Sequence, residues 1–250
     1  MTPHILVVTA VAAEADSVAA GLDRPEAGQT GQTRETGKTE VPLPGGFVLR
    51  RHGNVDVLAA GVGPAAAAVA AATALTASAS APTYDLVVSA GIAGGFQPLA
   101  PLGSVVVSDA VVAADLGAQT PDGYLAVEEL GFGRSVHRVA KPLTDRIAAA
   151  LPDAVVGPIL TVSTVTGTAG RAAELAERHP GAVAEAMEGF GVAEAAAAHG
   201  VPVVEIRAVS NAVGPRDRAA WRIGEALAAL QSAFRQLSRT AFVELPSCPS

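Results

Sequence analysis

Short runs rich in Val, Ile and Leu alternate along this chain with longer runs rich in Ala. The short runs predict buried strands over residues 4–10, 55–61, 85–91, 103–112, 157–164 and 201–210. The Ala-rich runs predict helices over residues 14–22, 64–78, 142–151, 169–179, 187–200 and 221–238. Because strands that alternate with helices form a sheet covered on both faces, the pattern predicts a three-layer α/β/α fold around a mainly parallel, twisted central sheet.

No internal repeat or change of composition divides the chain, which favours a single domain over residues 1–245. The segment 25–40 is rich in Gly, Thr and Gln and is nearly free of apolar residues. Such a segment cannot cover a core, so it is predicted to be a mobile surface loop. Residues 246–250 are predicted to form a frayed tail.

Composition and charge narrow the class of function. Half of the 250 residues are apolar but only 4% are aromatic, so the core must consist mainly of Ala, Val and Leu. The net charge of -7 argues against a nucleic-acid partner, although local charges can still form a site for an anionic small molecule. The only cysteine, Cys248, cannot form a disulfide framework or a cysteine-based metal site within one chain, and no metal is expected.

The apolar run near the start of the chain does not fit a secretory signal. No Lys or Arg precedes it, and Glu14 and Asp16 close it. No uninterrupted apolar run is long enough to span a bilayer. We therefore expect a cytoplasmic protein that does not bind membranes.

Two consecutive strands are each followed by a glycine-rich turn. In the first turn, Gly61, Gly63 and Ala66 have the spacing of a dinucleotide-binding motif. The acidic residue that should confirm this motif is missing, because Asp85 precedes the next strand instead of following it. We therefore expect no cofactor. The two turns predict either a backbone-lined pocket at the carboxyl edge of the sheet or simple tight turns.

Polar residues gather where the predicted strands end, which is the edge at which open α/β sheets bind ligands. They are Glu14, the turn 91–95, Thr164, Thr166, Glu188, Arg207, Ser210 and Asn211. Carboxylates, an arginine and an amide in one pocket favour acid/base chemistry on a polar substrate. For Glu188, a solvated acidic residue at a helix N-terminus is the alternative.

The chain resembles the nucleoside phosphorylase superfamily and, within it, the bacterial nucleosidase branch, over nearly all residues outside 23–45. The stretches that carry the resemblance are VVTAVAAEADSV, AGVGPAAAA, SAGIAGGF, GSVVVSDAVV, AMEGFGVA and VPVVEIRAVSNAVGPRDRAAWRIGEAL. The last stretch and TVSTVTGT are similar to the futalosine hydrolase family, which removes hypoxanthine from futalosine in menaquinone biosynthesis. The resemblance implies N-glycosidic hydrolysis and a homodimer or larger homo-oligomer.

The same resemblance assigns roles to single residues. Glu14 matches the carboxylate that deprotonates the attacking water, and Arg207 matches an arginine that fixes the water and the carboxylates. Met187 and Glu188 match a pair that packs on the sugar and holds its hydroxyl groups. Trp221 lies where relatives have an aromatic residue that closes over the ligand, although it also fits one face of an amphipathic helix.

Asn211 departs from the adenine-specific nucleosidases, which have Asp at this position. A neutral amide can donate to a carbonyl oxygen, so Asn211 fits a 6-oxopurine such as hypoxanthine. It is expected to act in catalysis by stabilising the leaving base. Gly91, Ile92, Thr164 and Thr166 are expected to contact the substrate.

Two further predictions concern the nucleophile and the residues at the far end of the substrate. The glycine-rich turns lack the arginines of a phosphate clamp, which favours water as the nucleophile. Arg216 either meets a carboxylate on the substrate or is an ordinary surface residue. Three alternatives stay open: a methylthioadenosine/S-adenosylhomocysteine-type nucleosidase, a purine nucleoside phosphorylase, and a nucleoside-binding protein without catalysis.

Overall fold

The computed structural model describes residues 2–23, 39–77 and 83–245. Its strands are β1 (Ile5–Thr9), β2 (Thr39–Pro42), β3 (Val48–His52), β4 (Val55–Ala59), β5 (Leu86–Gly95), β6 (Val105–Ala113), β7 (Gly117–Thr120), β8 (Gly123–Ala126), β9 (Val136–Arg138), β10 (Val155–Thr161), β11 (Ala184–Ala186) and β12 (Val203–Ala212). Its α-helices are α1 (Ala12–Leu22), α2 (Pro64–Ala77), α3 (Lys141–Ala150), α4 (Ala169–Arg178), α5 (Gly189–Ala198) and α6 (Ile223–Leu237). Short 3₁₀ turns are η1 (Pro44–Gly46) and η3 (Arg218–Ala220).

Every strand and helix predicted from the sequence forms within a few residues of its predicted bounds. The loop predicted over 25–40 lies outside the described residues up to residue 38, as does the tail 246–250. The last two residues of the predicted loop, Thr39 and Glu40, were predicted wrongly. They begin β2 and pair with Arg51 and Arg50 of β3.

The main sheet has the strand order β11-β10-β6-β12-β5-β1-β4-β3-β2, and β9 pairs with β6. Parallel pairs join β5 to β1 and β12, β1 to β4, and β10 to β6 and β11. The α/β class is confirmed, but the sheet is mixed, since β6 runs antiparallel to β12 and the short connections of β2, β3 and β4 allow only antiparallel pairing.

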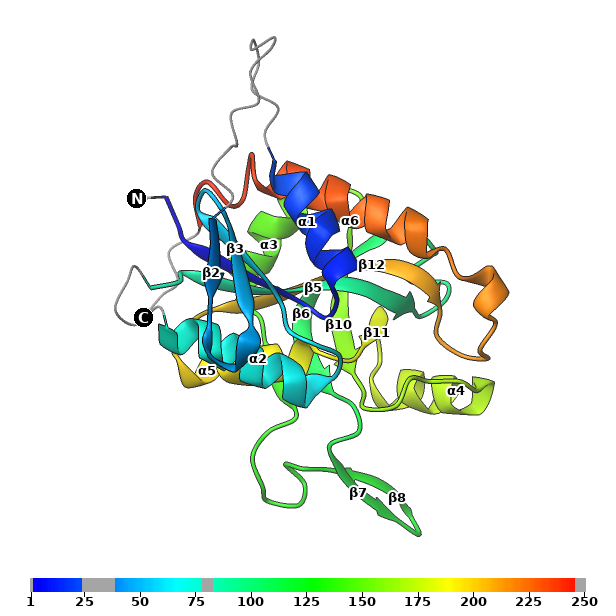
Figure 1. Ribbon diagram of the computed structural model, residues 1–250. Coiled ribbons are helices and arrows are strands. Elements are labelled where there is room, and N and C mark those ends of the chain that lie inside the picture. Colours follow the sequence, from blue (N-terminus) through cyan, green and yellow to red (C-terminus); the bar gives the residue numbers. More distant parts are fainter. Residues whose placement is uncertain (1, 24–38, 78–82, 246–250) are drawn as a thin grey trace.

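The core lies on both faces of the sheet, as expected for strands without a polar face. Ile5 and Val7 of β1 pack in a cluster with residues of α1, α3 and α6, whereas Leu6 and Val8 pack with α2 and α5. Figure 1 shows α1 and α6 above the sheet and α2 and α5 below it. The alternation along a single buried strand therefore builds the three layers.

One end of the sheet closes on itself. The short strand β11 pairs in parallel with β10 and also antiparallel with the end of β5. The strands β5, β12, β6, β10 and β11 therefore form a ring. Ala184 and Ala186 of β11 pack into a small apolar cluster together with Val106, Ile159 and Val209. This closure brings the segment before α5 to the ends of β5 and β12.

Candidate active site

Glu14 lies in the first turn of α1, directly after β1, and is buried. Its Oε2 accepts hydrogen bonds from the backbone N–H groups of Ala10 (3.0 Å) and Val11 (3.2 Å), and its Oε1 accepts one from Ile92 (2.9 Å). A carboxylate has about four acceptor positions. Three are occupied by the backbone, so Glu14 is held firmly and retains one position for a water molecule.

Arg207 of β12 connects the carboxylates of the site. It is 1% exposed, and its Nε donates to Glu205 Oε1 at 2.8 Å. Its Nη2 donates to Glu188 Oε2 at 3.1 Å and to Ser89 Oγ at 3.2 Å. Burial disfavours the charged guanidinium, but Glu205, Glu188 and Glu14 outweigh this effect and raise the pKa of Arg207. The arginine therefore stays charged and compensates the buried acids.

Glu188 occupies the N-cap position of α5, and the turn before α2 holds its side chain. Its Oε1 accepts a hydrogen bond from the backbone N–H of Gly63 at 3.1 Å. Gly191 permits this approach, because a side chain there would overlap the backbone carbonyl of Pro64. The glycine turn that resembled a dinucleotide motif therefore positions a carboxylate. This finding supports the pocket interpretation of that turn.

Glu205 is a member of the cluster that the sequence analysis missed. It is fully buried, and burial raises its pKa to about 7 against the lowering effect of Arg207. Its Oε2 has no hydrogen-bond partner among the described residues. The backbone of Gly189 lies so close that a side chain there would overlap the carboxylate. Among the described residues, the side chain of Glu205 bonds to Arg207, so Glu205 is a positioning residue.

Gly91 of β5 lies directly against the two charged groups of the site. A Cβ atom at this position would be 2.5 Å from Glu14 Oε1 and 2.6 Å from Arg207 Nη1. We expect Gly91→Ala to displace Glu14 and to lower kcat/KM by about 10–100-fold, because a misplacement near 1 Å costs about this much.

The matched control for this substitution is Gly224→Ala in α6, where an added Cβ meets nothing within 4 Å. Activity assays combined with thermal unfolding test the prediction. A Gly91→Ala enzyme with the activity of the Gly224→Ala variant would show that the contact does not matter.

Asn211 lies at the end of β12, next to this cluster. Its Oδ1 accepts from Ser210 Oγ at 2.8 Å, and its Nδ2 donates to the Ala212 carbonyl at 3.0 Å. These two contacts fix the orientation of the amide and leave one N–H for another acceptor. In the sheet, Asn211 is the register partner of Gly94.

The two threonines of the β10–α4 loop differ in their surroundings. Thr166 is buried and donates its backbone N–H and its hydroxyl to Glu185, whereas Thr164 is exposed. Met187 is half-buried and directly precedes Glu188. The structure thus ties Thr166 to β11 and leaves Thr164 on the surface.

Trp221 and Arg216 lie on the segment that follows β12. The guanidinium carbons of Arg216 and Arg218 are 5.7 and 5.8 Å from the centre of the Trp221 ring. The backbone N–H of Arg222 donates to the Ser210 carbonyl at 2.8 Å. This bond anchors the Trp221 segment beside Asn211, with two exposed arginines around the ring.

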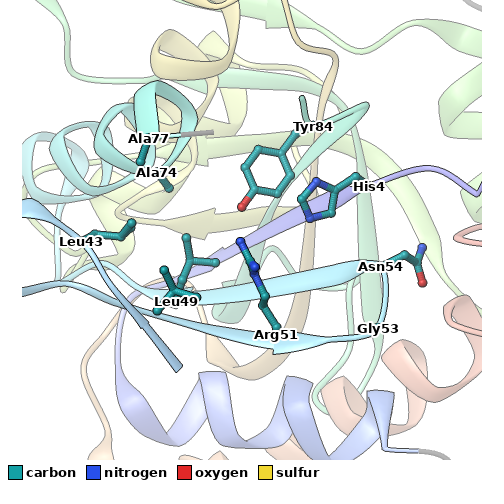
Figure 2. Close-up of a pocket in the computed structure, with 10 residues that line it drawn as sticks. His4, Leu43, Leu49, Arg51, Gly53, Asn54, Ala74, Ala77 and Tyr84 are labelled. Carbon is teal, nitrogen blue, oxygen red and sulfur yellow. The ribbon is translucent and has the colours of Figure 1, made fainter. Parts of the chain in front are cut away.

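A separate cavity of about 380 Å³ lies at the amino-terminal ends of β1 and β5, away from the residues described above. His4, which precedes β1, and Tyr84, which precedes β5, line this cavity. Figure 2 shows His4, Tyr84 and Arg51 directed toward one another within it. The Tyr84 hydroxyl donates to Asp56 at 2.7 Å, and His4 Nε2 lies 3.2 Å from the same carboxylate oxygen. The cavity therefore contains none of the residues predicted to act on a substrate.

No cluster of His, Cys, Asp or Glu within the described ranges could hold a metal ion. Over the same part of the chain, none of the helices could span a membrane.

The model of the phosphorylase superfamily matches residues 4–243. A futalosine hydrolase of Streptomyces coelicolor is 61% identical over 236 residues, which cover 94% of this chain and 95% of that relative. The chain belongs to the futalosine hydrolase family.

Solved structures of the superfamily have the same fold. The futalosine hydrolase of Helicobacter pylori superposes with a TM-score of 0.76 at 16% identity, covering 95% of this chain and 97% of that one. A 5'-methylthioadenosine/S-adenosylhomocysteine nucleosidase from Neisseria meningitidis gives 0.74 at 18% identity, with 94% and 97% covered. At these identities, the likeness concerns the fold alone.

In this member of the futalosine hydrolase family, several predicted site residues lie together. Glu14, Gly91, Ile92, Glu188 and Arg207 form one connected cluster. The neighbours of these residues that sequence reasoning missed are Ser89, Glu185 and Glu205. A signal for Glu205 was available, because Glu205 and Arg207 alternate with apolar residues in one buried strand.

Proposed function

We propose that this chain hydrolyses the N-glycosidic bond of futalosine and releases hypoxanthine and dehypoxanthine futalosine in menaquinone biosynthesis. The observation that carries the proposal is the buried cluster of Glu14, Arg207 and Glu188 in a chain of the futalosine hydrolase family. The reaction needs water as its second substrate and no cofactor.

Glu188 acts on the sugar. Its two oxygens are already fixed by Gly63 and Arg207, so their remaining lone pairs can accept hydrogen bonds from the ribose hydroxyls. As the bond to the base breaks, the sugar gains positive charge, which a preorganised carboxylate stabilises. Met187 packs against the sugar beside it.

Glu14 acts on the water. The water oxygen forms a bond to the anomeric carbon, and its proton moves to the acceptor position that the backbone leaves free on Glu14. A positioned base of this kind contributes about 10²–10⁴-fold to a rate. The backbone N–H groups of Ala10, Val11 and Ile92 hold Glu14 in place, and the charge of Arg207 attracts it.

Asn211 acts on the base. The base leaves with the electron pair of the broken bond, is stabilised by the free N–H of Asn211, and takes its proton from water. The orientation set by Ser210 and Ala212 presents Asn211 as a donor, which suits a 6-oxopurine. Thr164 and Thr166 are proposed to contact the substrate from the β10–α4 loop.

Trp221 and Arg216 act at the far end of the substrate. We infer that the ring closes over the ligand and that Arg216 meets its carboxylate. Support comes from the two arginines around Trp221 and from the backbone bond that holds this segment beside Asn211. We also propose that the protein is cytoplasmic and forms a homodimer or a larger homo-oligomer.

The test is to incubate the protein with futalosine, inosine and methylthioadenosine, with and without phosphate, and to follow base release by chromatography. We expect hypoxanthine from futalosine at a rate that does not depend on phosphate. Adenine from methylthioadenosine would favour the thioether nucleosidase instead. A requirement for phosphate would favour a phosphorylase.

A further inference from the structure

Glu188 occupies the N-terminus of α5 without capping it. In many helices, the side chain of the N-cap residue accepts the backbone N–H of the second or third helical residue. Glu188 is the N-cap residue of α5, but its side chain makes no such bond. Its Oε1 accepts from Gly63 and its Oε2 accepts from Arg207. The first turn of α5 therefore needs an acceptor from another part of the chain.

Thr161, the last residue of β10, supplies this acceptor. Its Oγ1 accepts the backbone N–H of Phe190, the second residue of α5, at 2.9 Å. Thr161 and Phe190 are both buried, so water cannot easily replace the bond. The cap of α5 thus comes from a strand of the sheet instead of from the helix's own N-cap residue.

The sheet holds Thr161 beside the segment that carries Glu188. Thr161 is the register partner of Ala113 in β6 and of Ala186 in β11. The next residue, Val162, donates its backbone N–H to the Ala186 carbonyl at 3.0 Å. A single residue separates Ala186 from Glu188. The position of the Thr161 hydroxyl relative to Glu188 is therefore fixed by backbone pairing.

We propose that Thr161 is a positioning residue for Glu188, because its hydroxyl caps α5 and so leaves the Glu188 carboxylate free to face the sugar. This inference rests on the proposed function and deepens it.

The reason is a competition for one backbone donor. Without the hydroxyl, the N–H of Phe190 is a buried donor without a partner, which is unfavourable. Glu188 is the N-cap residue, and a negative charge is favoured at a helix N-terminus. Its carboxylate would therefore turn away from Gly63 and the sugar and toward its own helix.

The first experiment replaces Thr161 with Val, which keeps the branched shape of the side chain and removes the hydroxyl. We expect kcat/KM on futalosine to fall by about 10–100-fold, because a misplacement near 1 Å costs about this much. Thr161→Ser keeps the hydroxyl and should retain most of the activity. The matched control is Thr144→Val, which removes a buried hydroxyl from α3 and should leave the rate unchanged.

A general loss of structure would also slow the enzyme, so the effect of Thr161→Val is measured again in a Glu188→Ala background. If the hydroxyl acts through the Glu188 carboxylate, Thr161→Val changes kcat/KM little in this background, because the group that it positions is gone. An equal loss in both backgrounds would overturn the inference.

The last experiment does not depend on turnover. The amide proton resonance of Gly63 reports on the bond from Gly63 to Glu188 and is followed by heteronuclear NMR. We expect Thr161→Val to shift this resonance toward its position in Glu188→Ala, whereas Thr161→Ser and Thr144→Val leave it in place. A folded Thr161→Val protein with an unshifted Gly63 resonance would refute the role of Thr161. Absence of base release from futalosine would refute only the proposed function.

Discussion

Glu14→Gln is expected to reduce the rate of hypoxanthine release by about 10²–10⁴-fold while futalosine still binds. Glutamine keeps the length and shape of the side chain but has no charge and accepts a proton far less readily. Its amide nitrogen would also face an N–H donor, because both oxygens of Glu14 accept backbone hydrogen bonds. The measurements are single-turnover base release and calorimetric binding of futalosine.

Asp16→Asn is the control for this prediction. Asp16 lies on the same helix, is exposed, and pairs with Arg50 at 2.6 Å on the surface. Its conversion to the amide should leave the rate within about twofold, because an exposed ion pair contributes little energy. A Glu14→Gln enzyme that is as fast as the Asp16→Asn enzyme would refute the assignment of Glu14 as the base.

Arg207→Met is expected to lower the free energy of unfolding by about 3–5 kcal/mol. The substitution leaves Glu205 and Glu188 buried without their cation, and removing one partner of a buried ion pair costs far more than removing both. The free energy is measured by urea denaturation at pH 8, above the pKa of about 7 that Glu205 has while Arg207 lowers it. In the variant this pKa rises, so Glu205 must either stay charged without a cation or take up a proton, and both cost free energy at this pH.

Two variants test the physical reason for this loss. The double variant Arg207→Met/Glu205→Met should be more stable than Arg207→Met alone, because it removes the acid along with the cation. Arg218→Met alters an exposed arginine and should change the free energy by less than about 0.5 kcal/mol. A loss that is equal in the single and double variants would indicate a packing defect instead.

Local patterns were sufficient to predict the layers and the positions of Glu14 and Glu188. The runs around Val7 and Val88 are buried on both faces, so their strand character is visible without knowledge of their partners. Glu14 was found because it directly follows a buried strand. Glu188 was found because it directly precedes an apolar helix, at the edge where such sheets bind ligands.

Features that depend on distant pairing could not be predicted. β11 has three residues, and only its pairing with both β10 and β5 makes it a strand. The antiparallel contact of β6 with β12 likewise has no local signal. Glu185 was overlooked for the same reason, since its pairing with Gly94 of β5 joins segments far apart in the sequence.

The alternation of side chains along β11 limits the sequence changes that this strand can accept. Ala184 and Ala186 face the apolar interior of the ring, and Glu185 faces the opposite side. A one-residue slip of this strand would exchange the two sides and force the charge of Glu185 into the interior. An insertion or deletion in β11 would therefore break the ring of strands that closes this end of the sheet.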